Sequence, residues 1–548
     1  MNIQKLVDGM SVEELCGQVL AYDVQPKDDF ENTIKIIKKI KPGALFLCDF
    51  SLAENFDRQE ELLAQHNAYV AAANEGSPVP VIVCNDVENG PGSFSNLYEM
   101  LPNPMAWAAC DDEKLVERAG ELTAAISRSL GIHYALAPVV DINYNFRSPI
   151  VNIRAASDLP ERVIKIMGAY LRGLQKNRYM AGCLKHFPGD GVDDRNQHFL
   201  TSVNSLNKEQ WDNSFGKVYK TLFDEGAISV MAAHIACPAL GGAKDECGYL
   251  PATIDKTLIS DVLKGELGFR GCVISDAMSM IGTCSRVPLD QLAIRFFQAG
   301  GDLLLFPEPD DFDRLVHAVR TGVLPIERMK DAVKRCLLLK ESVRLDEEEK
   351  VRREIGDIAP YIEELQKISQ EIADKSVKTV RNFDGVLPIK PKKGAKVLLL
   401  NMLEPFFHKD PTGKELEAFR NYFEEKGYCV TSMDNAKHKQ LEKCVGDYDL
   451  VIVCLKFSSL DYHGATLRVG WNSVMTLWRG YALQNPNLVF VSFGDPYKLY
   501  DFPYARTYIN TFSISPSSQR AAAKLILGEI ESKAKNPVGL KGFFDRED

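Results

Sequence analysis

Eight short, almost continuously apolar runs alternate with helical patterns between residues 18 and 306. Such runs are typical of parallel strands buried on both faces, with the helices as crossovers between them. The alternation predicts an α/β fold whose N-terminal part is a (β/α)8 TIM-like barrel, with an open doubly wound sheet as the alternative. The expected strands are Gln18–Asp23, Ala44–Cys48, Pro80–Asn85, Tyr134–Val140, Ala181–His186, Ile228–Ala233, Cys272–Ser275 and Asp302–Phe306.

Helical patterns fill the gaps between these runs. Ser11 and Glu14 have the spacing of a capping box, which places the start of a helix near residue 11. The longer helices expected around the barrel are Glu54–Ala73, Asp112–Leu130, Leu159–Gln175 and Lys208–Glu225.

The sequence changes character after residue 345, where a charge-dense segment leads into the amphipathic pattern Tyr361–Lys375. We interpret residues 346–375 as a connector between a barrel domain, residues 1–345, and a second α/β domain, residues 376–548. The second domain is predicted to contain an open, mostly parallel sheet. Its expected strands are Lys396–Leu400, Tyr428–Ser432, Leu450–Leu455, Leu488–Ser492 and Thr507–Asn510, and its expected helices are Glu415–Lys426, Asn472–Ala482 and Ser517–Leu527.

Charge and cysteine content restrict the possible partners and compartments. The net charge of -10 and the pI near 5.6 argue against nucleic acid and anionic membranes as partners. No run is apolar over the roughly 18 residues that a membrane span needs, and the first residues lack the features of a secretory signal. None of the 13 cysteines forms a C-x-x-C pair, and several lie in apolar runs. These features predict a protein of the reducing cytoplasm without a structural metal.

Several expected barrel strands end in ionisable or amide side chains. The carboxyl ends of barrel strands share one face, and that face carries the chemistry in such folds. Carboxylates, amides and cations suit a polyhydroxylated ligand, because each sugar hydroxyl both donates and accepts hydrogen bonds. We expect a small oligosaccharide or glycoside as ligand and no cofactor, since no Gly-rich dinucleotide loop is present. The side chains concerned are Asn85, Asp86, Glu88, Asp141, Asn143, Asn145, Lys185, His186, His234 and Asp276.

The segment from Lys185 to His198 carries the most specific motif of the chain. It begins Lys-His-Phe-Pro-Gly-Asp-Gly, ends in a second histidine, and resembles without a gap the K-H-F-P-G-H-G-x-x-x-x-D-S-H loop of glycoside hydrolase family 3. The form is most similar to that of the bacterial two-domain β-N-acetylglucosaminidases of this family. Further resemblances extend over nearly the whole chain, at Val81–Gly90, Ala137–Arg154, Ile274–Met280, Val377–Ile389 and Ser492–Tyr497.

The resemblance implies retaining cleavage of a β-glycoside through a covalent glycosyl-enzyme. It makes Asp276 the nucleophile, because an ionised carboxylate can form and later release the glycosyl ester. It makes His198 the acid/base, a role that suits an imidazole with a pKa near 6.5. The sugar ligands that it implies are Asp86, Arg154, Lys185 and His186, supported by Asp141, and the position of His234 at a strand end adds that residue as a further candidate.

Two loop positions depart from the family pattern. Asn196 stands where the family has an aspartate beside the acid/base histidine, and an amide can accept a hydrogen bond from Nδ1 but supplies no charge. An analogous Asp→Asn change in serine proteases costs about 10⁴ in rate. Asp190 stands where the family has another histidine, and the nearby carboxylates Asp190, Asp193 and Asp194 are candidates to replace the missing one.

The leading hypothesis is a cytoplasmic, exo-acting β-N-acetylglucosaminidase that trims small fragments of cell wall or chitin. A β-glucosidase, or a phosphorylase that uses phosphate in place of water, is the alternative within the family. A catalytically weak sugar-binding homologue is a third hypothesis because of Asn196, and a Schiff-base aldolase that uses Lys185 is a fourth. The segment Tyr462-His463-Gly464 of the second domain is a further candidate for the cleft. Nothing in the sequence indicates the oligomeric state.

Overall fold

The computed structural model describes residues 2–25, 29–47, 56–95, 97–403, 416–457, 469 and 471–547. They form two compact units. Compact unit 1 consists of Met1–Glu99, Val116–Ile142 and Val163–Leu365, and compact unit 2 consists of Met100–Leu115, Asn143–Arg162 and Gln366–Asp548. Two segments from the first 345 residues therefore belong to unit 2, and the limit between the units falls within α15 (Ala359–Ser376). The domain limits expected from the sequence stay a prediction.

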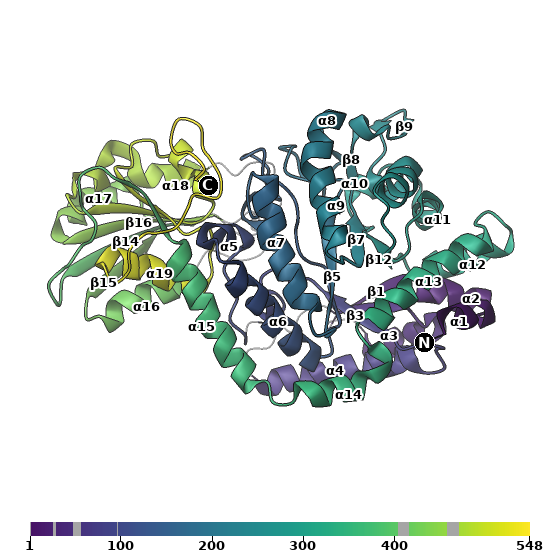
Figure 1. Cartoon of the computed structure of the whole chain (residues 1–548). Coiled ribbons are helices and arrows are strands. Elements are labelled where there is room, and N and C mark those ends of the chain that lie inside the picture. Colours follow the sequence, from purple (N-terminus) through teal and green to yellow (C-terminus); the bar gives the residue numbers. More distant parts are fainter. Residues whose placement is uncertain are drawn as a thin grey trace. The chain divides into compact units, whose positions relative to one another are not determined.

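Compact unit 1 is built around eight parallel strands in the order β11-β7-β5-β4-β3-β2-β1-β12 (Figure 1). A parallel bridge between Ile274 and Leu303 joins the two ends of this sheet and closes the ring. The predicted (β/α)8 barrel is thus confirmed, and the open doubly wound sheet is wrong for this part of the chain. The strands are β1 (Leu20–Val24), β2 (Ala44–Leu47), β3 (Ile82–Asn85), β4 (Tyr134–Ala135), β5 (Ala181–Phe187), β7 (Ser229–Ala232), β11 (Cys272–Ser275) and β12 (Leu304–Leu305).

All eight expected barrel strands are present, most of them shorter than predicted. The fourth strand, β4, has only two residues, because Pro138 lacks the N–H group that would continue the ladder. Beyond that proline, Val139 makes an isolated parallel bridge to Lys185. Cys48, at the end of the second expected strand, lies outside the described residues.

Helices connect successive strands of the barrel. α2 begins at Val12, with Ser11 as its cap and the Glu14 side chain completing the predicted capping box. The expected helix Lys208–Glu225 is interrupted by a π-helical turn, Asp212–Gly216. The α-helices wholly or mostly in unit 1 are α1 (Ile3–Gly9), α2 (Val12–Gln18), α3 (Phe30–Ile40), α4 (Phe56–Asn74), α6 (Glu113–Ser129), α7 (Pro160–Gln175), α8 (Lys208–Trp211), α9 (Lys217–Asp224), α10 (Ile281–Cys284), α11 (Leu289–Ala299), α12 (Asp311–Arg320), α13 (Ile326–Ser342) and α14 (Glu348–Ile355).

The barrel interior is a packed core rather than a pore. Buried side chains from six or more strands meet there, among them Ala21, Phe46, Ile82, Cys183 and Ile274. Cys336 and Leu339 of α13 belong to the same cluster and pack against the strand side chains. Because the interior is filled, a ligand can enter only at an end of the barrel.

Compact unit 2 contains a six-stranded sheet in the order β13-β18-β17-β16-β14-β15. The five expected strands are all present and pair in parallel, as predicted. The edge strand β13 (Lys378–Asn382) was not expected and pairs antiparallel with β18. Four of its five residues are polar and all are only half-buried, so no apolar run marks it. The other strands are β14 (Lys396–Leu403), β15 (Cys429–Asp434), β16 (Leu450–Phe457), β17 (Leu488–Gly494) and β18 (Thr507–Asn510).

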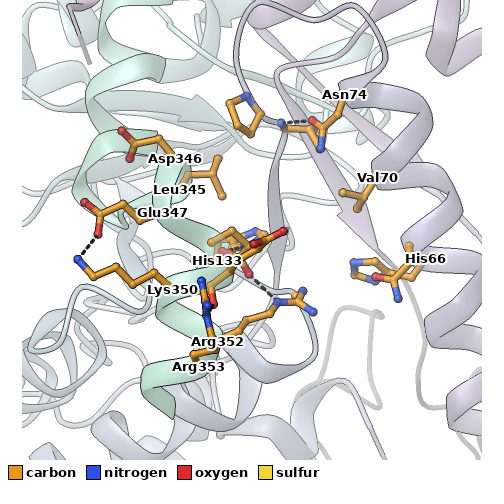
Figure 2. A pocket seen from close by; sticks show the side chains of 16 residues that line it. His66, Val70, Asn74, His133, Leu345, Asp346, Glu347, Lys350, Arg352 and Arg353 are labelled. Carbon is orange, nitrogen blue, oxygen red and sulfur yellow. Dashed lines mark hydrogen bonds and ion pairs between the residues drawn. The ribbon is translucent and has the colours of Figure 1, made fainter. Parts of the chain in front are cut away.

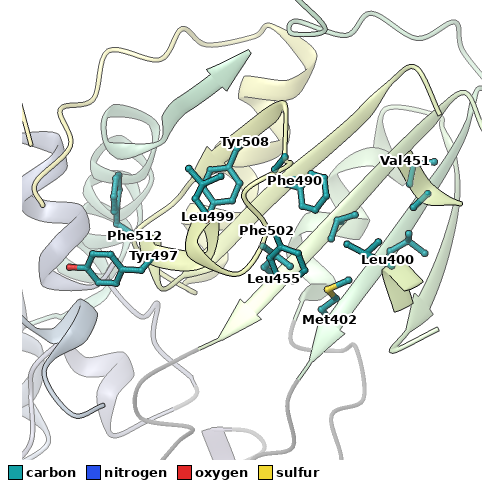
Figure 3. Close-up of a cluster of buried hydrophobic side chains, with 14 of the residues drawn as sticks. Leu400, Met402, Val451, Leu455, Phe490, Tyr497, Leu499, Phe502, Tyr508 and Phe512 are labelled. Carbon is teal, nitrogen blue, oxygen red and sulfur yellow. The ribbon is translucent and has the colours of Figure 1, made fainter. Parts of the chain in front are cut away.

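The sheet of unit 2 is covered on both faces, because alternate side chains of its strands enter different clusters. Leu400, Met402 and Phe490 pack in the cluster of Figure 3, together with Met105 of α5 (Pro104–Cys110). Val397 and its alternate neighbours pack on the other face with α16 (Glu417–Glu425) and α19 (Pro516–Leu527). The inner strands are therefore apolar on both faces, and they appear in the sequence as nearly continuous apolar runs.

One expected helix of unit 2 is mostly wrong. Of the span 472–482, only its first residues belong to a helix, α18 (Trp471–Val474). A 3-10 segment follows, and Trp478 and Arg479 within it have non-helical backbone angles. The unexpected α17 (His438–Cys444) is present instead between β15 and β16, and Glu415, the expected start of another helix, lies outside the described residues.

The cysteines and the helices can be compared with the expected compartment. All twelve cysteines in the described part of the chain are free. Among the described helices, none has the combination of length and apolar content that crossing a membrane requires. In the same residues, no three His, Cys, Asp or Glu side chains are grouped in a way that could hold a metal ion.

Candidate active site

The carboxyl ends of the barrel strands bring together five of the side chains expected in the site. Lys185 and His186 lie near the end of β5, and Asp86 and Asp276 directly follow β3 and β11. His234 follows β7 by two residues. Because all of these strands run parallel in one closed sheet, their carboxyl ends lie on the same face. The expected clustering is therefore present in unit 1.

Lys185 lies between two carboxylates. Its Nζ is 2.7 Å from Oδ1 of Asp86 and 2.7 Å from Oε1 of Glu88. Lys185 and Glu88 are largely buried, whereas 51% of the Asp86 side chain is exposed. Two nearby carboxylates favour the charged form of an amine, which is not the form that a Schiff base requires. Asp86 is the member of this group that is open to a ligand.

Asp141 orients His186 through both of its carboxylate oxygens. Its Oδ2 is 2.7 Å from Nδ1 of His186, and its Oδ1 accepts the backbone N–H groups of His186 (3.1 Å) and Asp190 (2.8 Å). The Nδ1–H group therefore faces the carboxylate, and Nε2 is the ring nitrogen that can meet a sugar hydroxyl. Asp190 accepts the Gly191 N–H through Oδ1 at 2.7 Å, so both aspartates stabilise the turn after β5.

Asp276 is partly buried at the end of β11 and is held through its backbone. Its N–H donates to the Ala232 carbonyl at 2.9 Å, and its Oδ1 accepts the Ala277 N–H at 2.8 Å. Burial raises the pKa of this carboxyl, but the imidazoles of His234, His186 and, more weakly, His198, together with the Ala277 N–H, lower the pKa by more. The net pKa lies below its usual value, so Asp276 is an ionised carboxylate at neutral pH.

His198 is oriented by the amide of Asn196. The Asn196 Oδ1 accepts the His198 backbone N–H at 2.9 Å and lies 2.7 Å from Nδ1 of the same residue. Because a backbone N–H can only donate, the shared acceptor is the amide oxygen, and Nδ1 must carry a hydrogen. In the neutral ring Nε2 is then the nitrogen without a hydrogen. The His198 carbonyl accepts the backbone N–H of Ile281 at 3.1 Å, so the His198 loop lies against the segment that follows Asp276.

The loop between β5 and His198 is held by side chains from the next helices. Gly189 has a φ of +118°, and a Cβ there would lie 2.2 Å from the Phe215 ring, so only glycine fits this turn. The indole Nε1 of Trp211 donates to the Pro188 carbonyl at 2.8 Å. Asp193 binds its neighbour Arg195 and accepts the Val203 N–H at 2.8 Å. These contacts fix the backbone that carries Asn196 and His198.

Two expected contributors are not among the described residues of compact unit 1. Arg154 belongs to compact unit 2, on the 3-10 turn Asn152–Arg154, where it is buried and donates through Nη1 to the Ile150 carbonyl at 3.2 Å. Its role as a sugar ligand stays a prediction. The segment Tyr462-His463-Gly464 lies outside the described residues.

Comparison with known proteins identifies the family of the chain. The family model described as the glycosyl hydrolase family 3 N terminal domain matches residues 11–339, which is more than half of the chain. The chain belongs to glycosyl hydrolase family 3. The resemblance identified in the Lys185–His198 segment is thereby confirmed, and the protein is a glycoside hydrolase.

This family 3 hydrolase has relatives with both sugar specificities in their names. It is 31% identical over 488 residues to the beta-N-acetylglucosaminidase/beta-glucosidase of Cellulomonas fimi, with 86% of each chain covered. It is 33% identical over 258 residues to the beta-hexosaminidase of Stenotrophomonas maltophilia strain K279a, covering 46% of this chain and 74% of that one.

Solved structures similar to the family 3 hydrolase extend over almost its whole length. The structure of the beta-glucoside phosphorylase BglX bound to 2FGlc has a TM-score of 0.84 and 28% identity, and the match covers 98% of this chain and 96% of that one. The family 3 beta-N-acetylglucosaminidase from Paenibacillus sp. str. FPU-7 has a TM-score of 0.78, 23% identity and coverage of 97% and 99%. The second likeness supports the fold alone.

Sequence reasoning counted Glu88 only among the polar strand-end side chains and gave no role to Gln197 or Thr283, which both contact His234. Glu88 pairs with Lys185, and its position two residues after Asp86 is a signal that could have indicated this. Gln197, which directly precedes His198 in the sequence, accepts the His234 backbone N–H at 3.2 Å. Thr283 contacts the His234 ring from α10, and no pattern in the sequence marks it.

A hollow of unit 1 lies at the amino ends of β3 and β4 (Figure 2). Its volume is about 510 Å³. Glu348 at the start of α14 lies there, 2.5 Å from Nη2 of Arg128, 2.8 Å from Nε of Arg352 and 3.4 Å from Nε2 of His133. Because these charges compensate one another at the face away from the catalytic strand ends, we interpret the group as stabilising the barrel.

Proposed function

We propose that this family 3 hydrolase is a retaining, exo-acting enzyme that removes terminal β-linked N-acetylglucosamine, with Asp276 as nucleophile and His198 as acid/base. The observation that carries the proposal is the pairing of an ionised carboxylate with an imidazole whose Nε2 is the exchangeable nitrogen. Both lie at the carboxyl end of a barrel, where such folds place their chemistry. A nucleophile plus a proton carrier is the minimum set for a double displacement.

The proposed reaction has two steps. In the first, Asp276 attacks the anomeric carbon while the bond from that carbon to the leaving oxygen breaks, and Nε2–H of the protonated His198 gives its proton to that oxygen. In the second, a water molecule gives a proton to the now neutral Nε2 and its oxygen attacks the anomeric carbon. The bond to Asp276 breaks, the free sugar is released, and both residues return to their initial states.

The proposed sugar ligands are Asp86, Lys185 and His186, together with Arg154. The half-exposed Asp86 carboxylate can accept from hydroxyls, while Lys185 and the Nε2 side of His186 are oriented by buried carboxylates. Such pre-oriented charged groups support tight geometry at the reacting ring. The free cysteines support a reducing compartment such as the cytoplasm, where short wall-derived or chitin-derived fragments would be the substrates.

Phosphorolysis is the second candidate reaction, favoured by two observations. The neighbour of His198 is the neutral amide of Asn196, and a site with fewer carboxylates repels an incoming phosphate anion less. A similar solved structure is that of a beta-glucoside phosphorylase. In this reaction a phosphate oxygen replaces water in the second step, and a glycosyl phosphate is the product.

The test is a matrix of nitrophenyl β-glycosides of N-acetylglucosamine and glucose, assayed with and without inorganic phosphate. Turnover of the acetamido sugar without phosphate supports the leading proposal, and a glycosyl phosphate product supports the second. Asp276→Ala is expected to abolish turnover of each substrate, and a 2-fluoro sugar trap is expected to label Asp276. Label on another side chain, or an active Asp276→Ala variant, overturns the mechanism. Sugar binding without any turnover would instead favour a catalytically weak homologue.

A further inference from the structure

His234 contacts the immediate sequence neighbours of both proposed catalytic residues. Its backbone N–H donates to Oε1 of Gln197 at 3.2 Å, one residue before His198. Its ring Nε2 lies 2.9 Å from the carbonyl of Ala277, one residue after Asp276. Because a carbonyl can only accept, Nε2 carries the hydrogen of this bond. One residue therefore connects the two segments, with its ring bound to the nucleophile segment and its backbone N–H bound to the loop of the acid/base.

The other ring nitrogen also has protein partners. Nδ1 of His234 lies 2.5 Å from Oγ1 of Thr283 and 2.8 Å from Oγ1 of Thr253. Thr253 donates its own hydrogen to the Ala232 carbonyl at 3.3 Å, which leaves Thr283 as the donor to Nδ1. Burial lowers the pKa of His234, in keeping with a neutral ring that has one donor and one acceptor nitrogen.

The same two segments also meet directly beside His234. The Ile281 N–H donates to the His198 carbonyl at 3.1 Å, and Oγ1 of Thr201 donates to the Gly282 carbonyl at 2.7 Å. A Cβ on Gly282 would lie 2.3 Å from the Gln197 carbonyl oxygen and 3.0 Å from Cβ of His234. The close approach requires glycine at this position. The nucleophile segment and the acid/base loop are thus in direct, close-packed contact, so a shift of one segment would displace the other.

We infer that His234 is a positioning residue that fixes the Asp276 carboxylate relative to His198, and that it is not a sugar ligand. The inference rests on the proposed roles of those two residues. It replaces the expectation from the sequence that His234 binds sugar, because both ring nitrogens face protein groups. A displacement of a reacting group by about 1 Å can cost about 10²-fold in rate. Loss of the hydrogen bonds that hold His234 could displace Asp276 by such a distance and is therefore expected to lower the rate measurably.

Two matched substitutions separate the ring nitrogens. Gln in place of His234 is long enough to put its amide N–H near the position of the ring Nε2, where it can still donate to the Ala277 carbonyl. The shorter Asn reaches only the position of Nδ1, where its Oδ1 can accept from Thr283. We expect His234→Asn to lower kcat by about 10²-fold with KM within about threefold, and His234→Gln to restore most of that loss. The loss should be equal for dinitrophenyl and nitrophenyl leaving groups, because Asp276 acts on both. Impaired proton donation alone would slow only the poorer leaving group.

Other outcomes overturn the inference. A rise in KM at constant kcat would make His234 a sugar ligand, and a fall in thermal stability with unchanged kcat would leave it a structural residue. If the wild-type enzyme turns over no glycoside, the proposed function fails separately. Crystal structures of the wild type and His234→Asn then decide the present inference. A shift of the Asp276 carboxylate relative to His198 supports it, and superimposable sites contradict it.

Discussion

Nδ1 of His198 lies 2.7 Å from Oδ1 of Asn196, so the proposed acid/base is held by a neutral amide rather than by a carboxylate. The amide fixes the tautomer and the ring orientation as a carboxylate would. It does not stabilise the charged imidazolium, which is the form that donates the proton. Asn196 therefore orients the His198 ring, but it stabilises the imidazolium less than a carboxylate at the same position would.

The substitution Asn196→Asp tests this separation. A carboxylate beside Nδ1 favours the imidazolium and raises the pKa of His198, so the alkaline limb of the pH profile for kcat/KM should move to higher pH. Hydrolysis of substrates with poor leaving groups should accelerate about tenfold or more. Steady-state rates between pH 5 and 9 measure both effects. An unchanged profile would show that the amide is no handicap.

The same variant should act in the opposite direction on phosphate. A new negative charge near the attacking anion is expected to reduce phosphorolysis relative to hydrolysis by at least about tenfold. The ratio of glycosyl phosphate to free sugar at fixed phosphate concentration is the measurement. Asp193→Asn serves as the matched control, because Asp193 is in the same loop but binds Arg195. An equal change in both variants would contradict the electrostatic explanation.

Glu348 should contribute to the stability of the barrel without a role in catalysis. Its carboxylate pairs with buried Arg128 and with Arg352, and removing one partner of a buried pair typically costs about 3–5 kcal/mol. We expect Glu348→Gln to lower the free energy of unfolding by about 3 kcal/mol. Activity per folded molecule should be unchanged. Urea unfolding and active-site titration measure the two quantities, with exposed Glu349→Gln as control.

The pH dependence of this effect has a definite sign. Burial raises the pKa of Glu348, but His133, Arg128 and Arg352 lower it by more, so its net pKa lies well below the ordinary value. A carboxyl with a depressed folded-state pKa stabilises fully above its unfolded pKa of about 4.3 and progressively less below it. The wild type and Glu348→Gln should therefore converge in stability as the pH falls from 5 to 3. A constant difference over that range would contradict the assignment.

Lys340 on α13 should make stability increase with pH. It is almost fully buried, its Nζ donates to Oε1 of Gln18 at 2.7 Å, and burial lowers its pKa to about 7. Between pH 7 and 10 the unfolded chain binds the extra proton, so this group adds about 1.4 kcal/mol to the free energy of unfolding per pH unit. Lys340→Met should remove that slope, and exposed Lys334→Met on the same helix should not. Parallel profiles of the wild type and Lys340→Met would contradict the prediction.

The fold could be predicted wherever burial left a pattern in the sequence. The barrel strands and the inner strands of unit 2 are apolar on both faces, and all of them were expected. β13 and the segment after α18 could not be predicted, because half-buried polar residues and a non-helical turn leave no period. The assignment of Met100–Leu115 and Asn143–Arg162 to unit 2 depends on long-range packing, which no local pattern carries.

The candidate site was predictable to the extent that its residues end strands or belong to one loop. Asp276, Lys185 and His186 follow apolar runs, and their parallel arrangement brings them together. The two threonines on the His234 ring come from separate segments. Their meeting follows from tertiary contacts alone, which is why His234 was expected to bind sugar.

The two carboxylates on Lys185 should have separable roles. Asp86 is half exposed and Glu88 is largely buried, although both lie 2.7 Å from the ammonium. Asp86→Asn should lower kcat/KM by about 10–100-fold through lost charged hydrogen bonds to sugar, with little change in stability. Glu88→Gln should instead lower the free energy of unfolding by about 1–3 kcal/mol, because a buried ammonium loses one of its partners. Kinetics on a nitrophenyl glycoside and urea unfolding of both variants measure these effects, and equal losses of stability would show that both carboxylates serve the ion pair alone.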